Sequence, residues 1–529
     1  MSAPSARIGG RPPGGTSGTA EDPLRPSIAA RARPENPLSS SSLSSPTFPI
    51  HDFATWEPVL RLLRAANAES LAAPGGYVAG SVAQRGWTLP VRRLPAAGGA
   101  AGFAEMQAGM RAAQPVQDAL AEAGIDRLLC VADMAPDGRT RLHLLDPGPA
   151  VEEGSGPYPG ALVMVEGAVA EPWRRLPDSV PGAGPAPSVD LALLERTLRE
   201  RLPGAVGATG AEIAAAEARL GVTLPDELKV LYGVTQARSA EQDDEELDDE
   251  ELDDEELDDE DRDGVGHGEH ESVSEVLGCE LFSLDELYVA DAPSRPCSWR
   301  FAATTAVVTT PDAAVQGLVG SPGWIAFGDS GYGDVLAIDL TPGPRGHVGQ
   351  VIVLDHEQYI GAELVADSLT DILTQGFARS FRSRPWDRQP AVARVNVAAL
   401  KSIRDAVDPA LEVLEIGVWD DEPLSLAPLA ALPRLRTLTA SPDTLADPLE
   451  TSRLTGLEFL ELGARDWRLL LDAGAVPRTL SAAAIRAGDH HPLHIAALAN
   501  ELLALWDRPL ITVTLLEGDL GPGEQETGR

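Results

Sequence analysis

Residues 328–331 spell Gly-Asp-Ser-Gly, the tetrapeptide that surrounds the nucleophilic serine of chymotrypsin-like proteases. Attack by this serine would require a histidine as general base and an aspartate that orients the histidine. The sequence has no cysteine-flanked histidine motif upstream, and Tyr332 stands where a second glycine is expected. We therefore interpret Gly328, Gly331 and Gly333 as the flexible positions of a tight hairpin loop. No catalytic residue is predicted.

The same glycines do not match a phosphate-binding loop. Such a loop continues into Gly-Lys-Ser or Gly-Lys-Thr, which this sequence lacks here. Asp329 and Asp334 flank the glycines and would repel an anion. No cofactor is predicted.

Acidic and histidine-containing groups could suggest a metal site. Asp259, Asp261, Asp263 and Gly264 match the first half of a calcium-binding EF-hand loop, but His270 replaces the bidentate glutamate expected at its twelfth position. The other candidate groups are His267 with His270, and His490 with His491 and His494. Neither group has the cysteine or well-placed carboxylate that would complete a zinc site. We predict no specific metal site.

The formal net charge of this 529-residue chain is −39, and much of the excess lies in one run. Residues 241–263 contain eighteen carboxylates and one arginine, and they repeat Asp-Asp-Glu-Glu-Leu every five residues. A period of five places Leu247, Leu252 and Leu257 on no common face of a helix or strand. We predict a disordered acidic low-complexity insertion over residues 239–271, with a specific binding element as the alternative.

The charge also bears on the kind of partner. A negative field repels nucleic-acid phosphates and anionic lipid and attracts basic proteins. We therefore expect a protein partner with a basic surface, and neither nucleic acid nor membrane.

The cysteines and the first residues bear on the compartment. Cys130, Cys279 and Cys297 form neither a CxxC pair nor a disulfide framework, which is typical of a reducing compartment. The first residues lack a signal-peptide pattern, and no run approaches the roughly 18 apolar residues of a membrane span. We expect a cytoplasmic protein.

The length allows about three domains. Residues 1–47 are rich in Ser, Pro, Gly and Ala and predict a disordered tail. Residues 48–178 predict a small α+β domain of unknown role. Its predicted elements are a helix from Thr55, a helix over 103–123 that Pro115 bends or splits, and strands over 128–132, 141–145 and 161–166.

Two short helices precede the acidic run. After a Pro- and Gly-rich linker at 181–187 and a helix from Ser188 to Pro203, Thr209 and Glu212 form a capping box that begins the first of them. Gly221 supplies the left-handed residue that ends it. Pro225 then opens the second helix, which Gly233 ends.

Five segments of this region occur in a recognisable order. The helix pair EARLGVTLPDELKVLY spans 217–232, and it is followed by LFSLDEL at 281–287, WIAFGDSGYGD with LAIDL at 324–340, VIVLDHE at 351–357 and a closing helix at 368–374. This order resembles the SUKH superfamily, which includes Smi/Knr-type cell-wall-synthesis regulators and many bacterial toxin-immunity proteins. The acidic insertion replaces a short polar loop that is usual in the family. The resemblance implies an α+β domain over residues 188–384 that acts by protein recognition.

The C-terminal part shows a repeat. Leu-rich segments at 411–416, 435–440 and 457–462 follow one another in steps of 24 and 22 residues, within the range of leucine-rich repeats. Residues 492–506 predict a helix and residues 510–516 a final strand. We expect a short leucine-rich-repeat-like array over residues 398–517, which would stack its strands into a protein-binding face.

Taken together, the sequence predicts a multidomain α+β protein whose central domain has an antiparallel sheet and flanking helices. The function implied by the resemblance is non-enzymatic binding, either immunity against a toxin, with a basic toxin domain as the partner, or regulation and scaffolding by surface occlusion. The candidate partner-binding residues are Trp324, Asp329, Tyr332, Asp334, Asp355 and Glu357. The alternative is a small-molecule hydrolase or transferase with a site in the N-terminal domain.

Overall fold

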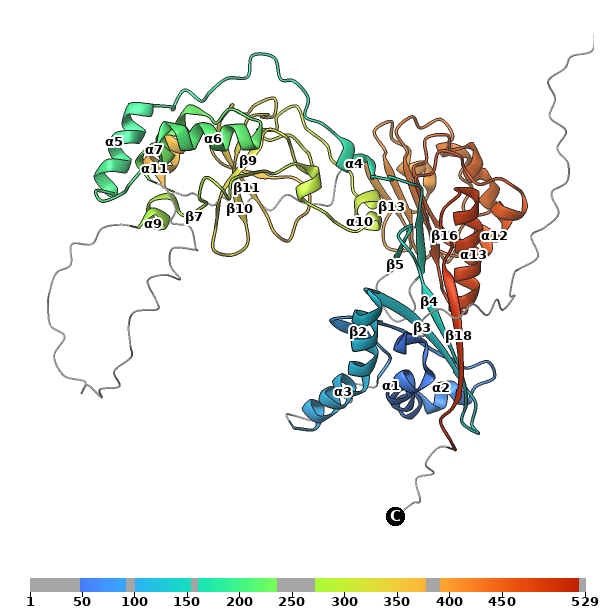
Figure 1. Cartoon of the computed structure of the whole chain (residues 1–529). Coiled ribbons are helices and arrows are strands. Elements are labelled where there is room, and N and C mark those ends of the chain that lie inside the picture. The colour runs from blue at the N-terminus through green and yellow to red at the C-terminus, as the bar shows by residue number, and fades with distance from the viewer. Residues whose placement is uncertain (1–47, 92–99, 154–159, 236–271, 377–390, 523–529) are drawn as a thin grey trace, which may run out of the picture. The chain divides into compact units, whose positions relative to one another are not determined.

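The computed structural model describes residues 48–91, 100–153, 160–235, 272–376 and 391–522. Figure 1 shows that these residues form three β-sheets with helices packed on them. The predicted N-terminal tail, the acidic run and the EF-hand-like motif lie outside the described residues.

The first sheet is antiparallel and has the strand order β18-β4-β3-β1-β2. Its strands are β1 (Val78–Ala83), β2 (Gly86–Thr88), β3 (Arg127–Met134), β4 (Arg139–Asp146) and β18 (Thr512–Asp519). Helices α1 (Phe53–Ala66), α2 (Ala68–Ala72) and α3 (Ala100–Ala123) follow the 3-10 turn Pro49–His51. Trp56, Leu63 and Leu120 belong to the core between these helices and the sheet. Helix α3 continues through Pro115, and β3 and β4 form the predicted hairpin.

The second sheet, which we call the central sheet, is antiparallel with the order β12-β11-β10-β9-β7, and β8 also pairs with β9. Its strands are β7 (Glu280–Leu281), β8 (Tyr288–Val289), β9 (Trp324–Asp329), β10 (Val335–Asp339), β11 (Gln350–Leu354) and β12 (Glu363–Ala366). The accompanying helices are α5 (Leu191–Arg201), α6 (Gly210–Leu220), α7 (Asp226–Val234), α9 (Val273–Leu277), α10 (Trp299–Thr304) and α11 (Leu369–Gln375), with a 3-10 turn at Ala292–Ser294.

The helix signals of the sequence are present in the structure. The Thr209 side chain accepts a hydrogen bond from the Glu212 amide, the Glu212 side chain accepts one from the Thr209 amide, and Gly221 is left-handed with φ 71°. Pro225 is the N-cap of α7. The predicted end at Gly233 is one residue early, because α7 continues through Gly233 to Val234.

The third sheet, which we call the parallel sheet, has the order β13-β14-β15-β16-β17-β6-β5. Strands β13 (Val392–Val395), β14 (Val413–Ile416), β15 (Thr437–Ala440), β16 (Phe459–Gly463) and β17 (Ala482–Arg486) are parallel, whereas β6 (Ala161–Met164) and β5 (Val151–Glu153) run antiparallel. The connections contain 3-10 turns at Ile403–Ala406, Ala427–Leu429 and Pro448–Arg453, and helix α12 (Ala464–Asp472). Helix α4 (Glu171–Arg174) follows β6, and α13 (Pro492–Leu505) follows β17.

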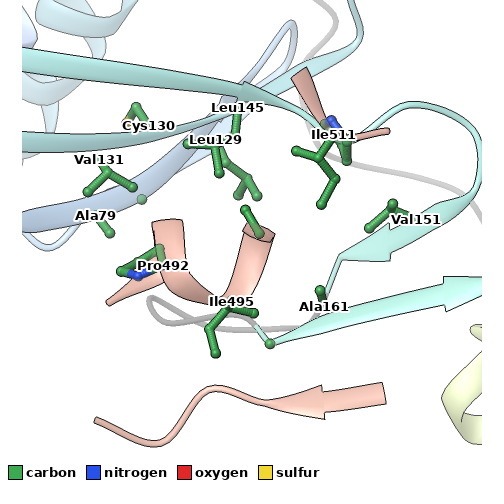
Figure 2. A pocket seen from close by; sticks show the side chains of 14 residues that line it. Ala79, Leu129, Cys130, Val131, Leu145, Val151, Ala161, Pro492, Ile495 and Ile511 are labelled. Atoms are coloured by element: carbon green, nitrogen blue, oxygen red, sulfur yellow. The ribbon is translucent and has the colours of Figure 1, made fainter. Parts of the chain in front are cut away.

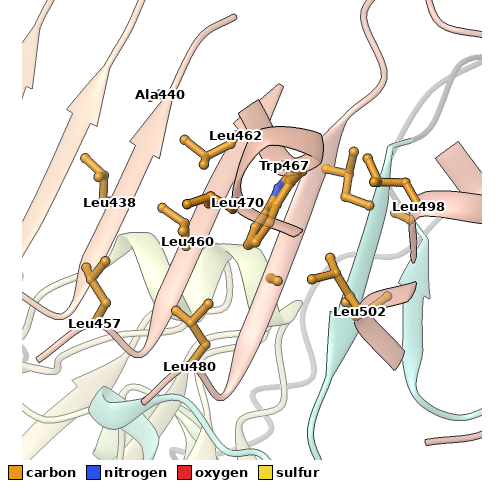
Figure 3. Packing of buried hydrophobic residues seen from close by; sticks show 14 of the residues in the cluster. Leu438, Ala440, Leu457, Leu460, Leu462, Trp467, Leu470, Leu480, Leu498 and Leu502 are labelled. Carbon is orange, nitrogen blue, oxygen red and sulfur yellow. The ribbon is translucent and has the colours of Figure 1, made fainter. Parts of the chain in front are cut away.

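The repeat steps are reflected in the pairing of these strands. Val413 pairs with Thr437, and Thr437 pairs with Phe459, which reproduces the steps of 24 and 22 residues. Leu438, Leu460 and Trp467 belong to an apolar core between one face of this sheet and helices α12 and α13 (Figure 3). Assignment of the sheet to the leucine-rich-repeat class stays a prediction.

Two strands pair with partners far away in the sequence. The sequence groups residues 161–166 with the N-terminal strands, but β6 pairs with β17 of the parallel sheet. It groups residues 510–516 with the repeats, but β18 pairs along its whole length with β4. An open strand edge can be filled by any strand of matching pattern, and sequence distance does not restrict that choice.

An apolar cavity of about 40 Å³ lies among the first sheet, β6 and α13 (Figure 2). Its lining includes Leu129, Cys130, Leu145, Ile495 and Ile511. Burial raises the pKa of the Cys130 thiol to about 12. The thiol therefore stays protonated at neutral pH and is a poor nucleophile.

The two sides of the acidic run meet in one core. Residues of α5, α6 and α7, of α9 and α11, and of the central strands share a single apolar cluster. The buried Glu227 of α7 reaches the N-terminus of α11, where it accepts hydrogen bonds from the amides of Leu369 (3.2 Å) and Thr370 (2.9 Å) and from the Thr370 hydroxyl (2.6 Å). A carboxylate at this end of a helix satisfies unpaired amides and complements the helix dipole.

We predict that Glu227→Ala lowers the free energy of unfolding by about 3 kcal/mol, because it leaves buried donors without an acceptor. Urea unfolding followed by circular dichroism measures the change. The control is Glu195→Ala, which removes an exposed pair with Arg199 and should cost about 0.5 kcal/mol or less. If the two variants lost the same free energy of unfolding, the proposed role of Glu227 in connecting α7 to α11 would be contradicted.

Candidate protein-binding surface

The hairpin between β9 and β10 and the turn after β11 lie at the same end of the central sheet. Val335 pairs with Asp329 on one side and with Leu354 on the other, so the ends of three strands are adjacent. Gly331 and Gly333 have φ values of 78° and 89°, which side chains with a Cβ rarely adopt. The predicted hairpin loop is confirmed at these two positions.

Gly328 has a different reason to be glycine. It lies within β9, and a Cβ there would lie 2.9 Å from both the Cys279 sulfur and the Glu280 carbonyl oxygen. Close approach of the chain after α9 therefore excludes a side chain, and the predicted turn freedom was wrong for this residue.

Tyr332 is the most exposed aromatic residue of this end of the sheet. Its side chain is 78 % exposed at the tip of the hairpin. The loop beneath it is fixed, because Asp329 accepts a hydrogen bond from the Gly331 amide at 2.7 Å and Ser330 accepts one from the Tyr332 amide at 3.3 Å. A rigid loop presents an aromatic side chain with little loss of conformational entropy on binding.

Asp334 and His356 join the hairpin to the neighbouring turn. Asp334 is buried, and its Oδ1 lies 2.8 Å from His356 Nδ1 and accepts a hydrogen bond from the His356 amide at 3.1 Å. The hydrogen bond to Asp334 raises the pKa of His356 above its ordinary value. This aspartate thus holds the turn in place and is not itself open to a partner.

Asp355 and Glu357 belong to the turn after β11. Asp355 accepts hydrogen bonds from the Glu357 amide (2.7 Å) and the Gln358 side chain (3.1 Å), which keeps its carboxylate at the surface end of the strand. Glu357 is exposed. These carboxylates add negative charge beside Tyr332.

Trp324 does not belong to this surface. Its side chain is fully buried, and its indole nitrogen donates to the Asp339 carboxylate at 3.0 Å. Asp339 is also buried and accepts hydrogen bonds from the Gln350 side chain and the Thr341 amide. Burial raises the pKa of Asp339. We therefore remove Trp324 from the candidate contact residues, because a buried indole in a strand cannot reach a partner.

The structure adds exposed aromatic residues that the sequence analysis did not select. Tyr288 and Tyr359 are exposed, and Tyr359 packs edge-on against Phe301 with ring centroids 5.6 Å apart. Arg295 fixes this region by donating to the carbonyl oxygens of Val319, Gln358 and Gly361. Single aromatic residues at scattered positions carry no sequence signal, since their proximity depends on the fold. We call Tyr288, Asp329, Tyr332, Asp355, Glu357 and Tyr359 the acidic-aromatic surface.

Ser330 of the protease-like tetrapeptide and His491 of the histidine group have structural roles, and so does His356, which belongs to neither pattern. Ser330 takes part in a turn, and His356 pairs with Asp334. Asp334, Asp355 and His356 offer potential ligand atoms within 4.8 Å of one another, and the Asp334–His356 hydrogen bond accounts for much of this closeness. His491 caps α13 and packs on Tyr77. Burial lowers the pKa of His491.

A raised pKa means that protonated His356 stabilises the turn below its unfolded pKa of about 6.5, and that this stabilisation is lost as the pH rises through the folded value. We predict that Asp334→Asn lowers the pKa of His356 toward its ordinary value. An NMR titration of the His356 ring measures both proteins. An unchanged pKa in the variant would contradict the assigned pairing.

Comparison with known proteins bears on the central sheet. Residues 207–375 match the SMI1 / KNR4 family (SUKH-1). A "Glucan synthesis regulatory protein" of Neurospora crassa is 30% identical over 140 residues, which cover 26% of this chain and 25% of the relative. The "Cell wall biosynthesis/cell cycle regulator smi1" of Schizosaccharomyces pombe is 44% identical over 62 residues, which cover 11% of this chain and 12% of the relative.

These matches leave most of each relative without a counterpart here, since the chain spans about a quarter of one and about an eighth of the other. Among the described residues, helices long and apolar enough to cross a membrane are absent.

The central sheet, with helices α6, α7, α9 and α11, lies within the matched range. This part of the chain, residues 207–375, is an SMI1/KNR4 (SUKH-1) domain.

Proposed function

We propose that residues 207–375 are a non-enzymatic, regulatory protein-binding domain and that the acidic-aromatic surface is its contact site. The observation that carries the proposal is the position of Tyr332, which is exposed at the tip of a rigid hairpin between carboxylates of two adjacent turns. Tyrosine is enriched among the residues that dominate binding energy at protein interfaces. Tyr288 and Tyr359 extend the aromatic area.

The partner in this proposal is a protein with a basic surface. Asp329, Asp355 and Glu357 place negative charge around Tyr332, and complementary charge guides encounter and fixes orientation. The acidic run at residues 241–263 belongs to the same domain and adds charge of the same sign. Attraction of this kind raises the association rate and weakens with salt.

The mode of action in this proposal is occlusion of a partner's surface. The names of the two fungal relatives concern regulation of glucan synthesis and of cell-wall biosynthesis. These names favour a regulatory role over toxin neutralisation. Both roles would use occlusion of a partner's surface. We also propose that the parallel sheet is a short leucine-rich-repeat-like array, supported by its pairing steps of 24 and 22 residues.

The alternative of a hydrolase or transferase in the N-terminal region has little support among the described residues. The cavity beside the first sheet is apolar, and its one ionisable group, Cys130, has a pKa raised to about 12. An active site needs converging polar groups with pKa values matched to the reaction. We therefore give the binding function precedence.

We predict that Tyr332→Ala combined with Glu357→Lys weakens binding of the full chain to its stoichiometric partner by at least about tenfold, because a hot-spot tyrosine contributes about 2 kcal/mol and the reversed charge repels a basic surface. The partner is captured from the native lysate, and its Kd is then measured with purified proteins over a salt series.

The matched control is Val418→Ala combined with Glu422→Lys. Both residues are exposed and follow β14, and this double substitution changes the net charge of the chain by the same amount. The control should bind like the unaltered chain. Equal affinity of all three proteins, or a Kd that does not depend on salt, would count against the acidic-aromatic surface.

A further inference from the structure

The two faces of the parallel sheet differ in chemistry. One face packs Leu414, Leu438 and Leu460 against an apolar core with α12 and α13. The opposite face buries polar side chains. Some belong to the strands and others directly precede them, and together they are Glu412, Arg436, Thr437, Thr439, Glu458 and Glu461. We call this set the polar face. Stability alone would be served at least as well by apolar residues, since buried ion pairs gain little over them.

A short helix of the SMI1/KNR4 (SUKH-1) domain covers the polar face. Trp299 and Ala303 of α10 join an apolar cluster with Phe459, and the rings of Trp299 and Phe459 lie 5.8 Å apart. The Thr437 hydroxyl and Arg436 donate to the Ala303 carbonyl oxygen at 2.7 Å and 3.0 Å. The last turn of α10 is therefore bound end-on by side chains of the sheet.

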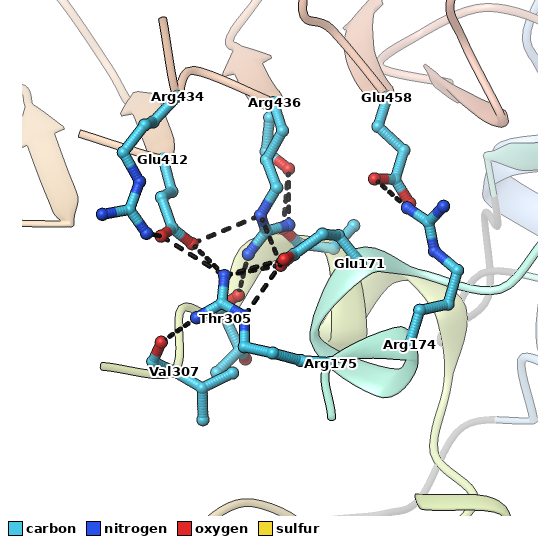
Figure 4. A network of polar contacts seen from close by, with 11 residues as sticks. Glu171, Arg174, Arg175, Thr305, Val307, Glu412, Arg434, Arg436 and Glu458 are labelled. Carbon is cyan, nitrogen blue, oxygen red and sulfur yellow. Dashed lines mark hydrogen bonds and ion pairs between the residues drawn. The ribbon is translucent and has the colours of Figure 1, made fainter. Parts of the chain in front are cut away.

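Arginines from α10 and from the segment of α4 complete the contact. Arg300 of α10 lies 2.8 Å from Glu461, which is 1 % exposed. Arg174 lies 2.8 Å from Glu458, and Arg175 lies 3.2 Å from Glu412. Figure 4 shows Arg175 between Glu171 and Glu412, with Arg434 and Arg436 reaching the same carboxylates.

Several polar atoms of this contact are buried without a hydrogen bond. They include Arg436 Nε, Glu458 Oε1 and Glu461 Oε2, although Arg436 Nε lies within ion-pair distance of Glu171 and Glu412. Burial lowers the pKa of Arg436 and raises that of Glu458, so burial opposes both charges. Opening the contact would return these groups to water, and this hydration offsets part of the lost pairing.

We propose that the polar face of the parallel sheet is a reversible docking surface whose resident ligand is this chain's own helix α10. The chemistry that it recognises is a short helix with a tryptophan and an adjacent arginine, followed by carbonyl groups at the helix end. While α10 is docked, the polar face is closed to other proteins. This inference does not rest on the function proposed for the acidic-aromatic surface, although Phe301 of α10 packs against Tyr359 of that surface.

Hydrogen exchange of the full chain, followed by mass spectrometry, tests reversibility. Because salt screens ion pairs, the amides of α10 should exchange about tenfold faster in about 1 M than in about 0.05 M NaCl. The amides of α12, on the apolar face, should not change. Equal and slow exchange of α10 and α12 at both salt concentrations would overturn the proposal, because α10 would then be part of the permanent core.

A substitution distinguishes the contribution of the Arg300–Glu461 ion pair from general effects of salt on exchange. Arg300→Gln should raise exchange of α10 about tenfold at low salt, because buried Glu461 loses one of its two arginine partners. The matched control is Arg141→Gln, which breaks an exposed pair with Glu517 in the first sheet and should leave α10 unchanged. An equal effect of the two variants, or none in Arg300→Gln, would contradict the proposal.

A labelled peptide of residues 298–308 tests recognition directly. It should bind the full-length Arg300→Gln chain at least about tenfold more tightly than the unaltered chain, whose own α10 competes for the surface. The same peptide with Trp299→Ala should not bind. Failure of the unaltered peptide to bind the Arg300→Gln chain would show that α10 is not a ligand of the polar face.

Discussion

The carboxylate of Glu227 connects parts of the chain that are separated by more than a hundred residues. It lies in α7, before the acidic run, and it caps α11, at the far end of the SMI1/KNR4 (SUKH-1) domain. The apolar cluster around it draws on helices from both sides of the run. Because a buried carboxylate must be satisfied by donors, this contact defines how the closing helix meets the opening helix pair.

A second buried carboxylate organises the strands themselves. Asp339 of β10 binds the Trp324 indole of β9 and the Gln350 side chain of β11, so one group fixes three adjacent strands. The opposite ends of the same strands carry the hairpin of Tyr332 and the turn of Asp355. The Asp339 network fixes the strands that carry the acidic-aromatic surface, whose own turns are held by Asp329, Ser330 and Asp334. Trp324 is therefore structural, at the end of β9 away from the hairpin, while Tyr332 at the hairpin tip is exposed.

The parallel sheet uses its two faces in different ways. Leucine and alanine side chains on one face form a continuous core with α12 and α13 (Figure 3), whereas glutamates and arginines on the other face hold α4 and α10 (Figure 4). An apolar core resists opening in proportion to the area that it would expose. The contact of α10 combines ion pairs with a smaller apolar cluster around Trp299 and Phe459, and its charged groups regain hydration when it opens, which makes it the more suitable of the two for reversible association.

The sequence by itself determined the local elements and the family resemblance. The capping box of Thr209 with Glu212, the left-handed Gly221, the hairpin glycines 331 and 333 and the repeat steps of the parallel strands all depend on neighbouring residues or regular spacing. The tertiary structure decided what depends on contacts between distant segments. It buried Trp324, brought Tyr288 and Tyr359 to the side of the hairpin, assigned β6 and β18 to unexpected sheets and placed α10 on the polar face. Such contacts are selected by shape and charge in three dimensions, and a linear pattern carries no record of them.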